Sequence, residues 1–355
     1  MSTPVRRIRV VVVTPFPAQQ FVHRDVAALS RWYDVWLVEG LWRWGLVRCA
    51  LLIPHSDFVL CWFGCRTAAA AVYLARVCGK PVAVIAGGQD VADLPEIGYG
   101  LIKSRRHRRF IRYAFRACNV ALPVSECTAA ELLKRVQPKA MVVIHNGVDL
   151  PRALGPKQSN AVLCVARVTA ATLEVKGIRT LLAAANELRE LSFTIVGEVT
   201  QDALRRLGPS LPGNVAFTGW LPHESVLALC DRARVYVQPS YYESFGVSVA
   251  EAMARGCIPV VTDRGALPEV VGDAGFYFRY GDHRGLCRSI ERAMREGVGA
   301  VAADRIREHF PIERRAERLH KLIESLVRDG SRREDKLARP DALQPTGNSH
   351  PGDGG

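Results

Sequence analysis

Short apolar runs rich in β-branched residues alternate with amphipathic stretches along almost the whole chain. Those of the first half, each a predicted buried strand, are IRVVVVT, DVWLV, FVLCWF, PVAVIAG, NVALPV and MVVIH. Those of the second half are NAVLCVA, SFTIVG, NVAFTG, RVYVQP, CIPVVT and AGFYF. Alternation of strands with helices predicts parallel sheets that are covered on both faces. Two successive sets predict two doubly wound domains, with a ligand site at the carboxyl ends of the strands.

A cluster of glycine, proline and polar residues at 145–160, HNGVDLPRALGPKQSN, marks the predicted domain boundary. A chain of 355 residues is expected to form more than one domain, each of roughly 150 residues. We predict an N-terminal domain over residues 1–152, a second domain over 153–310 and a helix over 311–330 that returns toward the first domain. The remaining segment, 331–355, has too few apolar residues to offset the entropy lost on ordering, and we predict that it is disordered.

Composition restricts the class of protein. Apolar residues make up 48% of the chain and charged residues 23%, which is typical of a globular soluble protein. No apolar run reaches the roughly 18–20 residues that a membrane-spanning helix needs. The first apolar run, in MSTPVRRIRVVVVTPFP, is short and closed by prolines, which predicts a buried strand and not a signal peptide. We therefore expect a cytoplasmic protein.

The ten cysteines lie mostly inside apolar stretches such as AVLCVA. Cys61 and Cys65 are the closest pair, and no second cysteine or histidine pair stands near them to complete a zinc site. This spacing predicts buried, reduced thiols and no metal site.

The formal charge of +13 is concentrated in the first half of the chain. Residues 1–150 contain 20 Lys/Arg and 10 Asp/Glu, whereas the remainder contains 28 and 25. An anionic partner is therefore expected to contact the first half. Residues 103–116, KSRRHRRFIRYAFR, contain seven Lys/Arg and no acidic residue. Four apolar residues there recur at helical spacing and predict a face toward the sheet, with a basic outer stripe: Phe110, Ile111, Ala114 and Phe115.

Residues 41–54, LWRWGLVRCALLIP, mix Trp42 and Trp44 with Arg43 and Arg48. Tryptophans beside cations suit an anionic membrane surface, where indoles lie at headgroup depth. The membrane contact would be peripheral, on the inner face of the cell membrane. A well-solvated helix with core tryptophans is the alternative interpretation.

The stretch YYESFGVSVAEAMARGCIPVVT, residues 241–262, places two carboxylates eight positions apart, at Glu243 and Glu251. A helix that begins near Phe245 or Gly246 has unpaired amide groups at its start, which attract phosphate oxygens. Gly246 allows a close approach to the backbone. Glu243 would lie in the loop beside the phosphate-bearing group, and Glu251 could accept hydrogen bonds from the hydroxyls of a ribose. The pattern favours a sugar-nucleotide site; a solvated helix start with ordinary acidic residues is the alternative.

The segment PSYYESFGVSVAEAMARGCIPVV resembles the Glu-x7-Glu signature of glycosyltransferase family 4, the retaining enzymes of the GT-B fold. Further segments stand in the family's order over most of residues 8–330: HNGVD, VLCVARVTAATLEVKGIRTLLAA, FTIVGE, NVAFTGWLP and TDRGALPEVVGDAGFYF. The resemblance implies two Rossmann-like domains that face each other across a cleft. It also implies that a sugar is moved from a nucleotide-sugar donor to an acceptor hydroxyl with retention.

The resemblance implies roles for individual residues. Arg167 and Lys176 would neutralise the donor diphosphate, a dense charge that needs fixed cations. Glu243 would contact the transferred sugar and Glu251 the ribose. The implied catalytic residues are Glu243, Arg167, Lys176 and Asp90. The donor site would further include Gly197, Phe245, Gly246 and Val247. The loop VTAATLEV between Arg167 and Lys176 is longer than the family's compact version.

The first domain departs from the family's pattern on the acceptor side. The segment after the first strand, TPFPAQQFVHRDVAAL, lacks the Gly-Gly loop, and in IAGGQDVADLPEIGYG a glycine, Gly87, stands at the usual histidine position. The candidate acceptor-side residues are Gln19, His23, Gly87 and Gly88. The departure leaves open a catalytically weak relative, against which the intact residues of the second half argue.

No Asp-x-Asp pair appears, and the resemblance implies neither a metal nor a cofactor. The implied acceptor is a saccharide or a lipid-linked molecule, in cell-surface polysaccharide or glycolipid synthesis. Another GT-B activity, such as sugar-nucleotide epimerisation or phosphorolysis, is the first alternative. Nucleic-acid binding is suggested by charge alone, and the sequence contains no recognised nucleic-acid module.

Overall fold

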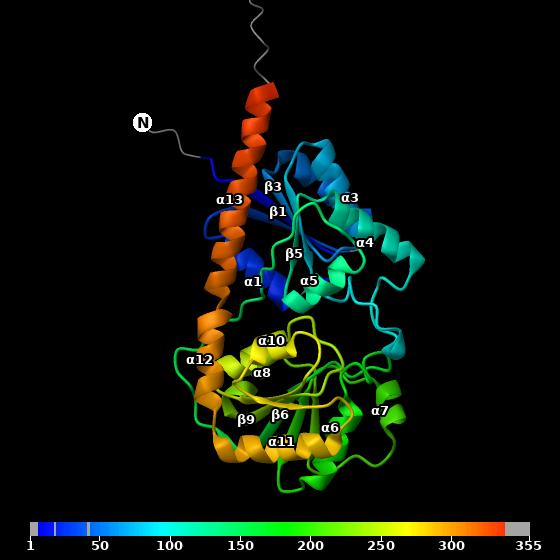
Figure 1. The fold of residues 1–355 in the computed structure, drawn as a ribbon, viewed down its shortest axis with the longest axis vertical. Coiled ribbons are helices and arrows are strands. Elements are labelled where there is room, and N and C mark those ends of the chain that lie inside the picture. Colours follow the sequence, from blue (N-terminus) through cyan, green and yellow to red (C-terminus); the bar gives the residue numbers. More distant parts are fainter. Residues whose placement is uncertain (1–5, 18, 41–42, 338–355) are drawn as a thin grey trace, which may run out of the picture.

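The computed structural model describes residues 6–17, 19–40 and 43–337 and forms two α/β domains stacked along the long axis of the molecule (Figure 1). The first domain contains a five-stranded parallel sheet of order β2-β1-β3-β4-β5. Its strands are β1 (Arg9–Thr14), β2 (Asp34–Glu39), β3 (Phe58–Trp62), β4 (Val82–Ala86) and β5 (Val120–Pro123). Its helices are α1 (Gln20–Leu29), α2 (Arg43–Leu52), α3 (Arg66–Val77), α4 (Arg105–Ala117) and α5 (Glu126–Leu133).

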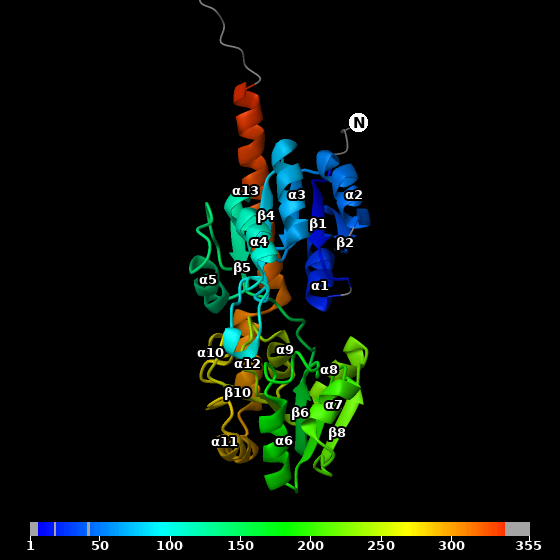
Figure 2. The ribbon, with the colours of Figure 1, turned by 90° about the vertical axis from the view of Figure 1, so that its right-hand side faces the viewer.

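Strand β1 shows why its sequence is apolar at every position. Val10 and Val12 belong to the core that includes residues of α1, whereas Val11 and Val13 belong to the core that includes residues of α3 and α4. A parallel strand between two helical layers buries both of its faces, so it reads as a continuous apolar run. Helices α2, α3 and α4 lie side by side over one face of this sheet (Figure 2).

The second domain contains a six-stranded parallel sheet of order β11-β10-β9-β6-β7-β8. Its strands are β6 (Gln158–Val165), β7 (Ser192–Val196), β8 (Val215–Gly219), β9 (Ala233–Gln238), β10 (Ile258–Thr262) and β11 (Phe276–Phe278). Its helices are α6 (Ile178–Glu187), α7 (Gln201–Leu207), α8 (His223–Arg232), α9 (Val247–Ala254), α10 (Leu267–Val271), α11 (His283–Glu296) and α12 (Gly299–His309). The predicted fold class, two doubly wound α/β domains, is confirmed.

One predicted strand, MVVIH, is not a strand of either sheet. Met141 forms an isolated bridge with Ala121, and the segment runs on beside β5 with Ile144 donating to Pro123 (3.0 Å). It is the start of the connection that leads to β6: Ile144 is buried, whereas Val142 is 39% exposed.

Helix α13 (Ile312–Leu337) runs along the first domain (Figure 1). The guanidinium of Arg315 binds both carboxylate oxygens of Asp25 on α1 (2.6 and 2.8 Å), and both side chains are buried. His320 stacks on Trp32 with ring centroids 4.5 Å apart. The helix includes residues 331–337, which were predicted as the start of a disordered tail; the rest of that tail lies outside the described residues.

All ten cysteines lie in the described part of the chain and are free thiols, most of them buried.

Within the described residues, no helix combines the length and the hydropathy that crossing a bilayer requires.

Candidate active site

A cleft of about 310 Å³ lies between the two domains, where both sheets present the carboxyl ends of their strands. The first domain contributes Gln20, Phe21, Trp62 and Gly87, which follow or end β1, β3 and β4. The second domain contributes residues 243–248, His223 and Glu251, and the connection between the domains contributes Asn146. The strand order reverses between β1 and β3 in one sheet and between β9 and β6 in the other, and such switch points are where doubly wound sheets bind ligands.

The loop after β9 leads into α9 through Gly246, the residue that precedes the helix. Gly246 has φ of 87°, a left-handed conformation that glycine adopts at little cost. The ring of Phe245 is buried and packs edge-on against Phe310 (5.4 Å). The backbone at Phe245, Gly246 and Val247 therefore borders the cleft, and the unpaired amides of the first turn of α9 lie at its edge.

Glu243 is held in one orientation by three donors. Its Oε1 accepts from Lys176 Nζ (2.5 Å), Ser240 Oγ (2.8 Å) and Gln238 Nε2 (3.1 Å). All three contacts end on Oε1. The other carboxylate oxygen, Oε2, accepts no hydrogen bond from the described residues. A carboxylate with one anchored oxygen is preorganised to accept a hydroxyl on the other.

Lys176 reaches Glu243 because the start of α6 packs against the end of β9. A side chain at Gly177 (φ 60°) would collide with the carbonyl oxygen of Pro239, so the close approach requires glycine. The long VTAATLEV segment folds as a compact turn. Thr172 Oγ1 donates to the Arg167 carbonyl (2.6 Å), and Leu173 and Val175 are buried. The extra length of this loop is therefore absorbed locally.

Arg167 does not take part in the contact between Lys176 and Glu243. Its side chain is 66% exposed, pairs with Glu198 (2.7 Å) and does not line the cleft. Gly197 (φ 141°) has a structural reason to be glycine, since a side chain there would collide with the carbonyl group of Ala166. The structure thus brings Lys176 into contact with Glu243, which lines the cleft, whereas Lys176 itself, Arg167 and Gly197 lie outside the cleft lining.

Glu251, predicted to hold a ribose, is only 6% exposed and makes an ion pair across the domain interface. Its Oε1 accepts from Arg24 Nη2, and Arg24 Nε also donates to Asp149 Oδ2 (3.0 Å). Sequence analysis missed Arg24. A basic residue in the middle of an amphipathic helix carries no local signal of a partner more than two hundred positions away.

His223 was also missed and lies beside this pair. Its Nε2 is 2.8 Å from Arg24 Nη2 and 3.4 Å from Glu251 Oε1. Burial lowers the pKa of His223, although the Glu251 carboxylate opposes the shift. The arginine can only donate, so the neutral imidazole accepts at Nε2 and carries its proton on Nδ1. The approach of His223 to Glu251 is therefore a proximity and not an ion pair.

The histidine that the family would place at Gly87 has no room here. A side chain at Gly87 would collide with the ring of Phe63. Phe63 has φ of 64°, the only positive φ of a non-glycine residue in the described chain, and its ring packs edge-on against Phe16 (5.5 Å) and Phe21 (6.0 Å). Such strain in an aromatic residue clusters at functional sites. The ring of Phe63 thus occupies the space that a side chain at position 87 would need.

Gly88 (φ 111°) is a point of contact between the domains, because a side chain there would collide with Ser244. The Ser244 carbonyl also accepts from Ser125 Oγ (2.6 Å) and Thr128 Oγ1 (3.1 Å) of the first domain. The loop between Glu243 and Gly246 is therefore held by both domains.

Three further predicted residues do not line the cleft. The Asp90 carboxylate is fully buried and accepts from the amides of Gly64 (2.7 Å) and Gly88 (2.9 Å), which contradicts a direct catalytic contact. Burial raises the pKa of Asp90 to about 6, against these amides, and the residue orients the glycine loop. His23 lies beside Glu39 (3.5 Å), and neither His23 nor Gln19 lines the cleft; Gln20 and Phe21 do so instead.

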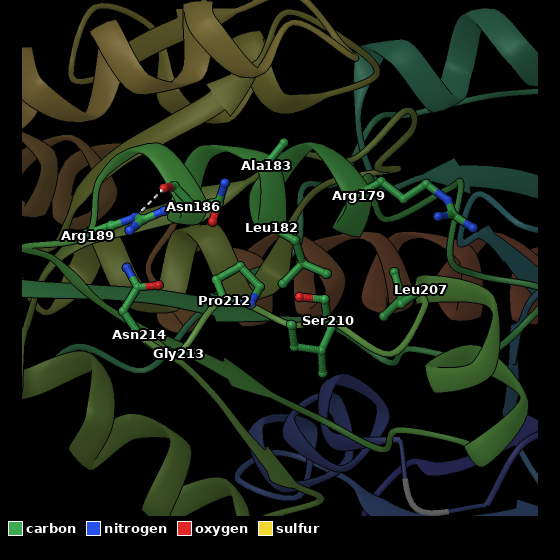
Figure 3. Close-up of a pocket in the computed structure, with 11 residues that line it drawn as sticks. Arg179, Leu182, Ala183, Asn186, Arg189, Leu207, Ser210, Pro212, Gly213 and Asn214 are labelled. Carbon is green, nitrogen blue, oxygen red and sulfur yellow. Dashed lines mark hydrogen bonds between the residues drawn. The ribbon is translucent and has the colours of Figure 1, made fainter.

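A larger cavity, of about 850 Å³, lies within the second domain between α6 and the segment 207–214 (Figure 3). In that view Arg189 folds back onto the carbonyl of Asn186 (3.2 Å). The lining contains none of the predicted site residues and no carboxylate. The interdomain cleft is therefore the candidate site. Among the described residues, no group of three or more His, Cys, Asp or Glu is arranged to hold a metal ion.

Two Rossmann-like domains that face each other across a cleft define the GT-B class of fold. The family model described as "Glycosyl transferases group 1" matches residues 159–296, so the second domain is a group 1 glycosyltransferase domain. The resemblance to glycosyltransferase family 4 is thereby confirmed.

Individual relatives agree with this assignment. Phosphatidyl-myo-inositol mannosyltransferase of Mycolicibacterium smegmatis is 29% identical over 222 residues, which are 58% of this chain and 55% of that protein. MMP alpha-(1->4)-mannosyltransferase of Mycolicibacterium hassiacum is 32% identical over 164 residues, 43% of this chain and 39% of that protein. The chain thus spans about half the length, or less, of these relatives.

Solved structures share the fold over both domains. Sucrose-phosphate synthase from Thermosynechococcus elongatus superposes with a TM-score of 0.74 at 17% identity, over 91% of this chain and all of that chain. HepE of Anabaena, in complex with UDP and glucose, has a TM-score of 0.74 at 15% identity, over 90% of this chain and all of that chain.

Proposed function

We propose that the protein is a retaining glycosyltransferase that moves a sugar from a nucleotide-sugar donor to an acceptor hydroxyl. The observation that carries the proposal is the Lys176–Glu243 pair, held at the start of α9 and at the switch point of the second sheet. A cation and a carboxylate at a helix N-terminus match a ligand that joins a diphosphate to a hydroxylated ring. UDP in the related HepE complex supports a nucleotide-sugar donor.

Each residue has a separate task in this proposal. Lys176 and the amides of Gly246 and Val247 stabilise the diphosphate, on which negative charge grows as the glycosidic bond breaks. Glu243 keeps Oε1 on its protein donors and accepts a hydroxyl of the transferred sugar on Oε2. Glu251 accepts a ribose hydroxyl. Arg167 joins the diphosphate by leaving Glu198, because an exposed ion pair costs little to break.

A thermal-shift panel tests the donor class. The panel contains UDP-glucose, UDP-galactose, UDP-N-acetylglucosamine, GDP-mannose and ADP-glucose. A bound donor at about 100 times its dissociation constant is expected to add about 2.7 kcal/mol to the free energy of unfolding. The proposal fails if no nucleotide sugar raises the melting temperature. Incubation of the binding donor without acceptor separates transfer from epimerisation, which would release the epimeric nucleotide sugar.

The same panel tests whether a metal takes part. We expect donor binding and transfer to survive EDTA, because Lys176 and the start of α9 meet the diphosphate charge. Transfer that disappears with EDTA and returns with magnesium or manganese would contradict metal independence.

The acceptor is proposed to be a saccharide or a lipid-linked molecule of cell-surface polysaccharide or glycolipid synthesis. Helices α2, α3 and α4 lie side by side on the first domain (Figure 2), and the side chains that they expose support contact with an anionic membrane surface. Helix α4 carries most of the basic residues of 103–116, and Trp44 on α2 is 81% exposed, which contradicts a core position. Trp42 lies outside the described residues. Phe110, predicted to face the sheet, is instead partly exposed, whereas Ala117 is buried. Exposed apolar residues continue this face: Val47, Leu51, Tyr73, Val77 and Tyr113.

Liposome co-sedimentation tests the membrane contact. Each cation near an anionic leaflet contributes roughly 1 kcal/mol, so we expect binding to anionic vesicles that disappears at 1 M salt, where the screening length is about 3 Å. The binding should also be lost when four exposed arginines of α4 become glutamate: Arg105, Arg106, Arg109 and Arg112. Arg108 is kept because its Nε donates to the Ile102 carbonyl (3.0 Å).

A matched variant controls for the change in net charge. Four exposed arginines of α11, on the second domain, become glutamate: Arg284, Arg288, Arg292 and Arg295. This variant is expected to sediment with anionic vesicles as the parent protein does. Equal sedimentation with neutral and anionic vesicles, or loss in both variants, would remove the membrane claim and leave the donor site unaffected.

A further inference from the structure

Arg24 extends from α1 of the first domain to the edge of the donor site in the second. Its Nη2 donates to Glu251 Oε1 and to His223 Nε2 (2.8 Å), and its Nε donates to Asp149 Oδ2 (3.0 Å). The side chain is 5% exposed. A guanidinium is planar and rigid, so three partners fix both its position and its plane. Arg24 Nη1 is buried without a hydrogen-bond partner. A buried donor without a partner lowers the stability of the folded protein, so we do not expect a side chain that serves stability alone to retain one.

The contacts of Arg24 and His223 both end on the same oxygen of Glu251. Oε1 receives Arg24 Nη2 and lies 3.4 Å from His223 Nε2, whereas Oε2 accepts no hydrogen bond from the described residues. Oε2 has no partner in the described chain and yet is not a fully buried atom, and Glu251 lines the cleft. One oxygen is therefore anchored to the other domain, and the other remains for a ligand.

We propose that Arg24 is a positioning residue for ribose recognition: it holds Glu251 so that Oε2 accepts a hydroxyl of the donor's ribose. The inference rests on the proposed function, which assigns the ribose to Glu251. A glutamate already fixed in one rotamer loses less side-chain entropy when the ligand binds. Because Arg24 belongs to the first domain and Glu251 to the second, the ribose site is complete only when the cleft is closed. Donor binding and domain closure are thereby coupled.

Calorimetry with paired nucleotides tests the inference. The probes are UDP, GDP, ADP and CDP, each compared with its 2′-deoxy counterpart. A hydrogen bond to a carboxylate predicts that the parent protein prefers the ribonucleotide by about tenfold or more. In Arg24→Ala this ratio is expected to fall to nearly one, because a mobile Glu251 no longer presents Oε2. A residue that only stabilised the closed protein would weaken both nucleotides equally and leave the ratio unchanged.

Two further variants keep the test decisive. Arg24→Lys retains the charge but not the planar fork and is expected to give an intermediate ratio; it replaces the alanine variant if that variant does not fold. Tyr241→Phe removes another hydrogen bond between the domains, from Tyr241 Oη to Glu96 Oε1 (2.6 Å), and leaves Glu251 untouched. Its ratio is expected to equal that of the parent protein.

The outcomes separate this inference from the proposed function. Full ribose discrimination in both Arg24 variants would overturn the role of Arg24, and so would loss of discrimination in Tyr241→Phe. A parent protein that binds nucleotides without preferring the ribose form would overturn the inference and leave the donor site standing. A parent protein that binds none of the nucleotides would refute the proposed function itself.

Discussion

Lys176→Ala is expected to lower the turnover of sugar transfer by about 100- to 1000-fold, the usual effect of removing one preorganised electrostatic contact from a transition state. The diphosphate gains charge as the glycosidic bond breaks, so the loss should fall more on kcat than on donor affinity. Glu243 keeps Ser240 and Gln238 as donors to its Oε1, so its orientation should survive the substitution. Steady-state kinetics together with calorimetric donor binding measure the two quantities separately.

Lys321→Ala is the matched control, because Lys321 is exposed on α13 and, unlike Lys176, makes no contact with Glu243. It is expected to show the kinetics of the parent protein. A Lys176→Ala enzyme with normal turnover and weakened donor affinity alone would contradict the assigned role.

Glu251→Ala is expected to lower the free energy of unfolding by about 3–5 kcal/mol, the cost of leaving a buried charge without its partner. The substitution leaves the Arg24 guanidinium with Asp149, which is more than half exposed, and with a neutral His223. Donor affinity should fall as well, by the worth of a hydrogen bond to a charged group, about 1.5–3 kcal/mol. Urea denaturation and calorimetry measure the two losses.

Two substitutions separate these effects. Glu251→Gln keeps an oxygen for Arg24 but removes the charge, and is expected to cost less stability than the alanine variant. Glu224→Ala removes an exposed carboxylate from the neighbouring helix α8 and is expected to change stability by less than about 0.5 kcal/mol. Parent-like unfolding of Glu251→Ala would show that the pair with Arg24 contributes no stability.

The fold class could be predicted because a parallel strand buries both of its faces and so leaves a continuous apolar run. Eleven of the twelve predicted strands form two parallel sheets. MVVIH was the exception: it runs beside β5 as a connecting segment in which only Ile144 is buried, and an apolar composition alone does not distinguish such a segment from a strand. Helix α13 continued past the predicted end because helix formation beyond residue 330 depends on continuation of an existing helix, which composition does not report.

Short-range motifs also located the loop that carries Glu243 and the start of α9, because a glycine before a helix and the spacing of two acids are local features. The acceptor side was different. Gly87 was recognised as a departure from the family, but nothing near it indicated that the ring of Phe63, twenty-four positions earlier, occupies the space. Asp90 was assigned to chemistry because its type suits catalysis, whereas the fold buries it under two backbone amides.

The sequence alone determined two doubly wound domains and the position of a sugar-nucleotide loop, since both depend on periodicities and motifs within a few tens of residues. Only the tertiary structure decided which side chains meet across the cleft. Arg24 and Glu251 are 227 positions apart, and their contact arises from how the two domains close on each other. The partner of a buried charge is set by this long-range geometry, so a chain read residue by residue shows the carboxylate but not the guanidinium that orients it.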